Sequence, residues 1–462
     1  MRTQTSNKKA DQMLNQSIRT LIPVMAVPTI VAQLITTIYN LVDTYFVSTL
    51  GTYATAAVGV NSSLERAITM TGSLIGAGAC SYIARLLGGK RKEDADRVLS
   101  TFLFIGLGLG CILLVLGQCF STPLVNLLGA TDDCRELSIQ YAFYVLFAAP
   151  FMVGQLVLNM CLRSEGSAVY SMVGIGFGGV LNCFLDPLFI YVFDMGVGGA
   201  SLATAISKFV SFVILLIPYL RKSTTVDLSI RHCKWNATDT KEVLSIGSAS
   251  FFRSGLGVVA SILLNNVAGS ISTAALAAFS VANRVMQFPF AIILGFGQGY
   301  QPVVGYNWSA KKAKRVRESF SFATMVSIVG AVVMAVILLF AAQPIVRLFN
   351  SQADASVLEI GVLCIRLESI VLPVHAWISI INMFYAGIGK ARYAMLLSTA
   401  RQGYCYIPVV LIIPMIFGVY GLAACQAIAD LLTLIPGIPL AIRAYRLIGE
   451  MEQEALAEES AG

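Results

Sequence analysis

Long apolar stretches recur twelve times along the chain, and they constrain its fold more than any other feature. A helix needs about 20 predominantly apolar residues to cross the hydrocarbon core of a bilayer, and a helix satisfies its own backbone polar groups there. We therefore predict an all-α polytopic membrane protein with twelve transmembrane helices. The predicted spans lie near residues 20–48, 54–84, 98–120, 137–162, 168–193, 197–220, 243–268, 273–306, 318–342, 357–388, 393–416 and 419–445.

The composition agrees with lipid as the main solvent. Hydrophobic residues make up 56% of the 462 residues and charged residues only 12%, and the mean hydropathy is +0.76. Soluble domains carry about 25% charged residues. The net charge of +7 does not indicate a nucleic-acid partner, because the basic residues lie in short loops between spans. The polar residues 1–19 lack the apolar region of a cleavable signal peptide, and the ten cysteines form no CxxC pair that would indicate a zinc site.

Lys and Arg residues give the expected orientation. They gather in the loops that follow even-numbered spans, near 86–97, 221–241 and 308–317, whereas the opposite loops hold few beyond Arg135 and Arg347. The positive-inside rule then places both termini in the cytoplasm.

The two halves of the chain repeat each other at an offset of 221 or 222 residues. Gly78 recurs as Gly299, and Gly196 recurs as Gly418. Because each half has an even number of spans, the halves enter the membrane in the same direction, related by a pseudo-twofold axis along the membrane normal, with a cavity between them. The predicted parts are an N-terminal six-helix lobe (1–220), a cytoplasmic linker (221–241) and a C-terminal six-helix lobe with an acidic tail (242–462).

Polar residues in the N-terminal half indicate an ion-coupling site. Asp43 and Asp186 each lie about eight residues before an outer turn, and Thr204 lies about eight residues after one, so all three are roughly 12 Å below the outer surface. Asn182 is one helical turn from Asp186, and Tyr141 lies at a similar depth. Carboxylates within a membrane are functional candidates.

Two ions fit this cluster. A buried carboxyl group can exchange a proton near neutral pH. Alternatively, Asp43, Asn182 and Asp186, with the carbonyl that Pro187 frees, could bind Na+. The repeat counterparts of Asp43 and Asp186 are Leu264 and Pro408, so the acids belong to one half only. A purely structural hydrogen-bonded network is the other interpretation.

The sequence resembles the multidrug and toxin extrusion (MATE) transporters of bacteria and archaea over nearly its whole length. The resemblance rests on several short segments taken together, in order, on a duplicated twelve-span chain. It implies V-shaped lobes, coupling residues at the five positions above, and export of organic cations and other toxic compounds driven by proton or sodium entry across the cytoplasmic (inner) membrane. Its carriers are Tyr39–Asp43, Asn182–Pro187, Gly196–Thr204, Gln301–Asn307 and Arg401–Gln402.

The C-terminal half carries a second set of polar residues at membrane depth. Asp430 and Glu368 are expected to neutralise neighbouring arginines. The alternative is that the arginines line the cavity and favour an anionic or zwitterionic substrate. Some family members have an acid in the seventh span where this chain has Arg253. The candidate substrate-cavity residues are Arg253, Arg284, Met286, Gln287, His375, Arg401 and Asp430.

The sequence leaves few functions open for this membrane protein. The chain shows no nucleophile–base pattern, metal-ligand spacing or phosphate-binding loop, so we expect no enzyme and no cofactor beyond H+ or Na+. Without an ATPase motif, transport must be secondary. We predict an antiporter for small organic, cationic or amphipathic drugs and toxins, acting as a monomer. The alternative is a lipid-linked saccharide flippase of the same superfamily.

Overall fold

The computed structural model describes residues 2–349 and 354–461, and all regular structure within these ranges is helical. Ten helices there are apolar and long enough to cross a membrane, the tenth being one continuous stretch over 391–457. Gly418, at φ 57° and ψ −138°, breaks that stretch into two spans. The 33-residue α12 (Ala355–Gly387), which carries Glu359, Arg366 and Glu368, completes the set. The prediction of twelve transmembrane helices is thus confirmed.

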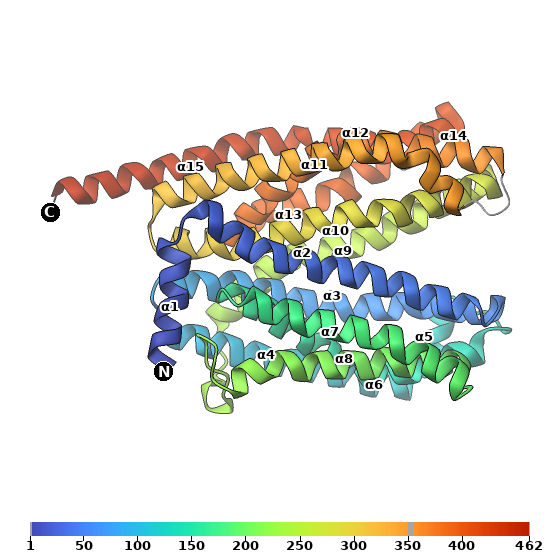
Figure 1. Cartoon of the computed structure of the whole chain (residues 1–462), viewed down its shortest axis with the longest axis horizontal. Helices are drawn as coiled ribbons and strands as arrows, with labels where there is room; N and C mark the ends of the chain where they lie inside the picture. Colours follow the sequence, from blue (N-terminus) through green and yellow to red (C-terminus); the bar gives the residue numbers. More distant parts are fainter. Residues whose placement is uncertain (1, 350–353, 462) are drawn as a thin grey trace.

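The helices form two six-helix lobes (Figure 1). The N-terminal lobe contains α2 (Ile18–Ser48), α3 (Thr52–Gly88), α4 (Lys92–Cys119), the short α5 (Ser121–Leu127), α6 (Arg135–Ser164), α7 (Ala168–Pro187) continued by the π-helix η1 (Leu188–Val192), and α8 (Gly196–Leu220). The C-terminal lobe contains α9 (Ala237–Ile271), α10 (Thr273–Ser309), α11 (Ala313–Phe349), α12, α13 (Ala391–Thr399), the π-helix η3 (Ala400–Tyr404), α14 (Tyr406–Leu432) and α15 (Leu434–Ala461).

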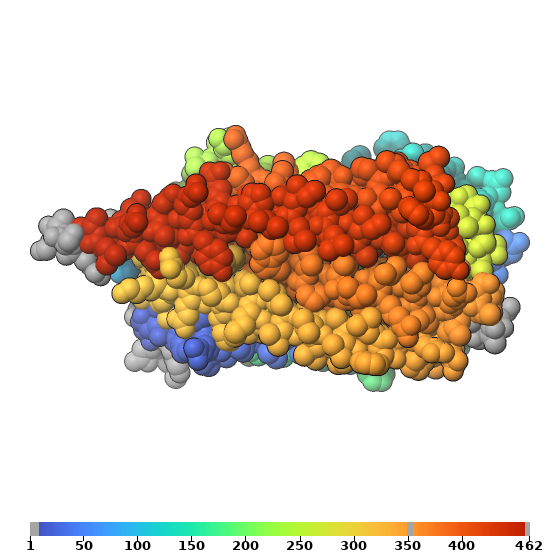
Figure 2. Space-filling view, turned by 90° about the horizontal axis from the view of Figure 1, so that it is seen from above, coloured from blue at the N-terminus to red at the C-terminus, as the bar shows by residue number. Residues whose placement is uncertain are grey.

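Both chain ends lie at the same end of the helix bundle, here called the terminus end (Figure 1). The last helix is longer than the sequence predicted. The apolar pattern ends near residue 445, yet α15 continues to Ala461 through the acidic tail. Figure 2 shows α15 running along the C-terminal lobe and projecting past the end of the bundle. The tail is therefore a helix that leaves the apolar body.

The backbone conformation, like the sequence, repeats between the two lobes. Lys90 and Lys311 follow the second span of each half, and both adopt positive φ, at 59° and 55°. Gly196 and Gly418 open the last span of each half, with φ of 55° and 57°. A left-handed conformation is rare for a Lys residue, so its recurrence shows that matching turns fold alike.

The largest contacts between the lobes are made by two equivalent helix pairs, and α3 also packs against α10. α2 packs against α10, and α3 packs against α9. At the terminus end, one apolar cluster joins the halves, including Ile22 and Leu99 from the first and Ile246 and Tyr300 from the second. Toward the opposite end, each lobe has its own cluster. The lobes are therefore closed together at the terminus end and packed separately at the other.

The N-terminal helix α1 (Arg2–Asn15) crosses the bundle at the terminus end (Figure 1). The Lys9 ammonium donates to the Ser167 hydroxyl at 2.6 Å, in the N-terminal lobe. The Met13 carbonyl accepts from Asn307 at 3.2 Å and from Arg315 at 3.3 Å, both in the C-terminal lobe. α1 thereby connects the two lobes.

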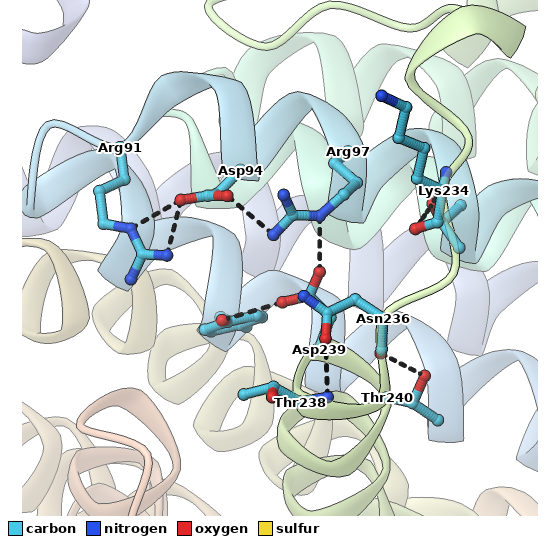
Figure 3. A network of polar contacts seen from close by, with 10 residues as sticks. Arg91, Asp94, Arg97, Lys234, Asn236, Thr238, Asp239 and Thr240 are labelled. Carbon is cyan, nitrogen blue, oxygen red and sulfur yellow. Dashed lines mark hydrogen bonds and ion pairs between the residues drawn. The ribbon is translucent and has the colours of Figure 1, made fainter.

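The segment between the lobes is bound to the N-terminal lobe by side-chain contacts. It contains one short helix, η2 (Ile230–His232). The buried Glu165 carboxylate accepts from the backbone N–H groups of Thr225 at 2.7 Å and Val226 at 3.0 Å. Figure 3 shows the Arg97 guanidinium between Asp94 and Asp239, so an ion pair ties α4 to the start of α9.

Candidate substrate and ion site

A cavity of about 940 Å³ lies between the lobes. Its walls come from α2, α3, α6, α7 and α8 on one side and from α9, α10, α12, α13 and η3 on the other. Because the lobes share their apolar core only at the terminus end, that end forms the closed floor of the cavity. The volume suits a drug-sized organic molecule.

The predicted coupling residues meet in the wall of the N-terminal lobe. Asn182 and Asp186 are four residues apart on α7, which places them on one helix face. The Asn182 amide donates to the Asp186 carboxyl at 3.0 Å and to the Thr204 hydroxyl on α8 at 3.4 Å. Asp43, on α2, faces Asp186 with its carboxyl group within hydrogen-bonding range. All three helices therefore contribute to one polar cluster behind the cavity.

Several oxygen atoms of this cluster have no partner within the described residues. They are Asp43 Oδ1, Asn182 Oδ1 and Asp186 Oδ2, each of them buried. Leaving a buried polar atom unpaired costs about 1–3 kcal/mol. Together these atoms form a set of oxygen acceptors that a proton or a small cation would satisfy. Pro187 ends α7 next to Asp186, and the chain continues as the π-helix η1, a geometry common at functional sites.

Tyr141 lies in the same wall and binds Glu65, a residue that the sequence analysis did not predict for the site. Its hydroxyl donates to the Glu65 carboxylate of α3 at 2.8 Å. Lys208 of α8 was also missed, and its ammonium donates to the Tyr39 hydroxyl of α2 at 2.5 Å. Lys208 lies close enough to Asp43 and Glu65 for direct electrostatic attraction. The wall thus carries its own cation beside the carboxyl groups.

A simple signal would have found both residues. Glu65 and Lys208 are charged and lie within apolar spans, where a charge marks a functional site by default. Both residues lie deeper along their helices than Asp43 does, so they fall outside the shared depth that marks Asp43, Asp186 and Thr204. Arg66 and the buried Arg163 also line the cavity, and the sequence did not predict them either.

Most predicted residues of the C-terminal lobe line the cavity. Arg253 does so from α9, Arg284 and Gln287 from α10, His375 from α12 and Arg401 from η3.

Two residues predicted for the cavity lie elsewhere. Met286 is fully buried within the core of the C-terminal lobe, so that prediction is wrong. The cavity-lining face of α10 includes Arg284 and Gln287, three residues apart, and Met286 points away from that face. Asp430 does not line the cavity. Its carboxylate accepts hydrogen bonds from the guanidinium group of the cavity residue Arg401, at 2.8 Å from Nε and 3.3 Å from Nη2.

The sequence matches a known family in both halves. The MatE family model matches residues 28–188 and 249–412, and the two matches start at repeat-equivalent positions. Multidrug export protein MepA of Staphylococcus saprophyticus is 28% identical over 406 residues, covering 88% of this chain and 89% of that protein. MepA of Staphylococcus aureus strain MSSA476 is 28% identical over 419 residues with the same coverage. These relatives favour multidrug export over the flippase alternative.

Solved structures agree with the fold. An outward-facing multidrug resistance MATE family transporter of the MOP superfamily superimposes with a TM-score of 0.90 at 25% identity, covering 96% of this chain and 98% of that one. A MOP superfamily transporter from Pyrococcus furiosus, described as having a binding pocket of reverse polarity, gives 0.88 at 25% identity with the same coverage. The chain therefore belongs to the multidrug and toxin extrusion (MATE) family of efflux transporters, in its prokaryotic branch.

Proposed function

We propose that this transporter is an antiporter that exports small amphipathic organic molecules in exchange for protons. The observation that carries the proposal is the pair formed by Asp43 and Asp186. Their carboxyl groups face each other beside the cavity, and each has a buried oxygen without a partner. Two carboxylates at hydrogen-bonding range repel unless a proton is shared between them.

Protons fit the site better than sodium because the wall already contains an ammonium group. Lys208 lies near Asp43 and Glu65 and is held by Tyr39. A fixed cation at that place opposes the entry of Na+ and leaves the Asp pair free to exchange protons. Binding of a proton from outside would then accompany substrate release, and the proton would leave to the cytoplasm when the cavity opens there.

Alternating access follows from how the lobes contact each other. The shared apolar cluster and the strap formed by α1 close the terminus end. Rocking of the lobes about this interface would close the other end and open this one. We place both termini in the cytoplasm and the chain in the cytoplasmic membrane of a bacterium, since the basic loops lie at the terminus end. A cavity built within one chain supports action as a monomer.

The test is transport in proteoliposomes with proton and sodium gradients imposed separately. We expect an inward proton gradient without sodium to drive dye efflux at a rate several times that of passive leak. A sugar-linked lipid serves as a second substrate and should not move. If only sodium drives efflux, the proton assignment fails. If neither gradient drives efflux, the antiport mechanism fails.

A further inference from the structure

The cavity wall from the C-terminal lobe is cationic. Three arginines line the cavity from this lobe, whereas no carboxylate does so among the described residues. Over the whole cavity, six cationic side chains face two carboxylates, Asp43 and Glu65, which both belong to the N-terminal lobe. The two walls therefore differ in charge, and the acids lie on the side of the coupling residues.

Two of these arginines have no protein partner. Arg253 and Arg284 make no hydrogen bond or ion pair within the described part of the chain, whereas Arg401 is bound by Asp430. Arg366, outside the cavity, donates to the Leu339 carbonyl. A guanidinium that serves only packing has such partners, because an unpaired charge within a membrane is expensive. Arg253 and Arg284 instead offer their donors to the cavity.

The surroundings of Arg253 suit the organic part of a ligand. The Arg401 guanidinium lies 4.2 Å from the centre of the Phe290 ring. That ring meets the His375 ring edge to face at 5.3 Å, and His375 is within electrostatic reach of Arg253 and Arg401. The Phe290 and His375 rings line the same cavity as Arg253 and Arg284, and aromatic rings in one cavity with unpaired guanidinium groups accept an apolar body with an attached anion.

We propose that Arg253 and Arg284 bind the carboxylate, sulfonate or phosphate group of an amphipathic organic anion, and that Phe290 contacts its apolar body. A guanidinium binds such groups through two parallel N–H donors, which the planar fork of Arg provides and Lys does not. The inference rests on the proposed function as an exporter and assigns the substrate class. Arg401, held by Asp430, is a positioning residue for Phe290.

The test compares two dyes with the same xanthene core and opposite charge. Fluorescein is the anion and rhodamine 6G is the cation. Binding to the purified full-length protein in detergent is measured by fluorescence polarisation without any ion gradient. We expect fluorescein to bind more tightly, and Arg253→Gln or Arg284→Gln to weaken that binding about tenfold or more, since each loses a charged hydrogen bond. Arg347→Gln, an exposed arginine outside the cavity, is the control and should change nothing.

The outcomes separate this inference from the proposed function. Tighter binding of rhodamine 6G, or fluorescein binding unchanged in both variants, overturns the anion site even if a proton gradient drives transport. Fluorescein binding that depends on both arginines supports the site even if no gradient drives efflux. An isoprenyl pyrophosphate is added as a competitor. If it displaces fluorescein at far lower concentration than a soluble aryl sulfonate does, the site is for a lipid headgroup and the small-anion assignment is wrong.

Discussion

Gly78 of α3 and Val243 of α9 lie so close across the lobe interface that a Cβ added to Gly78 would overlap the Val243 carbonyl oxygen. The same approach recurs on the other side of the pseudo-twofold axis. A Cβ on Gly299 of α10, the repeat equivalent of Gly78, would lie 2.5 Å from the Cα of Ala26 on α2. Two equivalent glycines thus allow the helix pairs to close the terminus end.

Replacing Gly78 should therefore open that end. We expect Gly78→Leu to shift the protein toward the state open at the terminus end, because forcing a side chain into a packed interface costs about 1–3 kcal/mol. A cysteine placed at the cavity residue Ser250 should then react about tenfold faster with a thiol reagent added from the terminus side of membrane vesicles. Gly108→Leu is the control, since no atom lies within 4 Å of a Cβ there. Equal rates in both variants would contradict a closing role for Gly78.

The acid pair should be required for coupling. Asp43→Asn and Asp186→Asn are each expected to reduce gradient-driven export to the passive rate, since an amide cannot exchange a proton. Expression and thermal stability should remain near those of the wild type. Asp194→Asn is the matched control, because Asp194 is exposed in the turn between η1 and α8 at φ 51°, which Asn also tolerates. Full proton-driven export by either pair variant would remove that residue from the mechanism.

Lys208 should determine which ion can drive export. In the Lys208→Gln variant the Asp43 and Glu65 carboxylates lose their neighbouring cation, so we expect Na+ to enter and a sodium gradient alone to drive dye efflux. Lys208→Arg keeps the charge and should retain the wild-type preference for protons. Efflux in proteoliposomes under each gradient measures this. Sodium coupling already present in the wild type would show that Lys208 does not exclude the ion.

Stability should depend on pH through Glu165, which lies between α6 and α7. Burial raises its pKa from 4.5 to about 7, against the attraction of Lys9 and two backbone N–H donors. The folded state therefore holds the proton more tightly than the unfolded chain, and stability falls as the pH rises from about 4.5 to 7. Glu165→Gln should remove this loss, which is worth up to about 3 kcal/mol.

Thermal unfolding measured from pH 5 to pH 8 checks the expectation for Glu165. The excess of the Glu165→Gln Tm over that of the wild type should grow from pH 5 to about pH 7 and then level off toward pH 8. Glu450→Gln, at an exposed position on α15, should follow the wild type throughout. A constant difference between Glu165→Gln and the wild type over this range would show that the carboxyl group does not titrate there.

The orientation can be tested by labelling single cysteines in intact cells. In a background without the exposed Cys111 and Cys119, an impermeant reagent should label cysteines placed within 49–53 or 194–197. It should fail to label cysteines within 86–97, 221–241 or 308–317. External labelling of the 221–241 segment would reverse the assignment of both termini to the cytoplasm.

The spans were predictable because residues that face lipid are predominantly apolar. The turn at Gly418 was predictable from its repeat partner Gly196. The strap formed by α1 was not, since its sequence is too polar to predict a packed helix, and its position depends on hydrogen bonds such as that of Lys9 to Ser167. Tertiary contacts of this kind leave no trace in local sequence.

In the candidate site, too, local contacts were predictable and contacts between distant helices were not. Asn182 and Asp186 share a helix face, so their spacing alone predicts the contact that the structure contains. Glu65 and Tyr141 come from different helices, and the packing of α3 against α6 brings them together at 2.8 Å. Sequence gives the depth of a residue along its helix but not which helices pack together. Met286 was misplaced for a related reason, because composition cannot show which face of α10 meets the cavity.

The arginines of the C-terminal wall bear on how the membrane voltage acts on transport. Exchange of one proton for a monovalent organic cation moves no net charge, so the voltage adds nothing. Exchange of one proton for a monovalent anion moves two positive charges inward. Each charge is worth about 2.3 kcal/mol per 100 mV. A cationic wall would therefore make the pump electrogenic, able to concentrate its substrate outside the cell on voltage alone, even where the internal and external pH are equal.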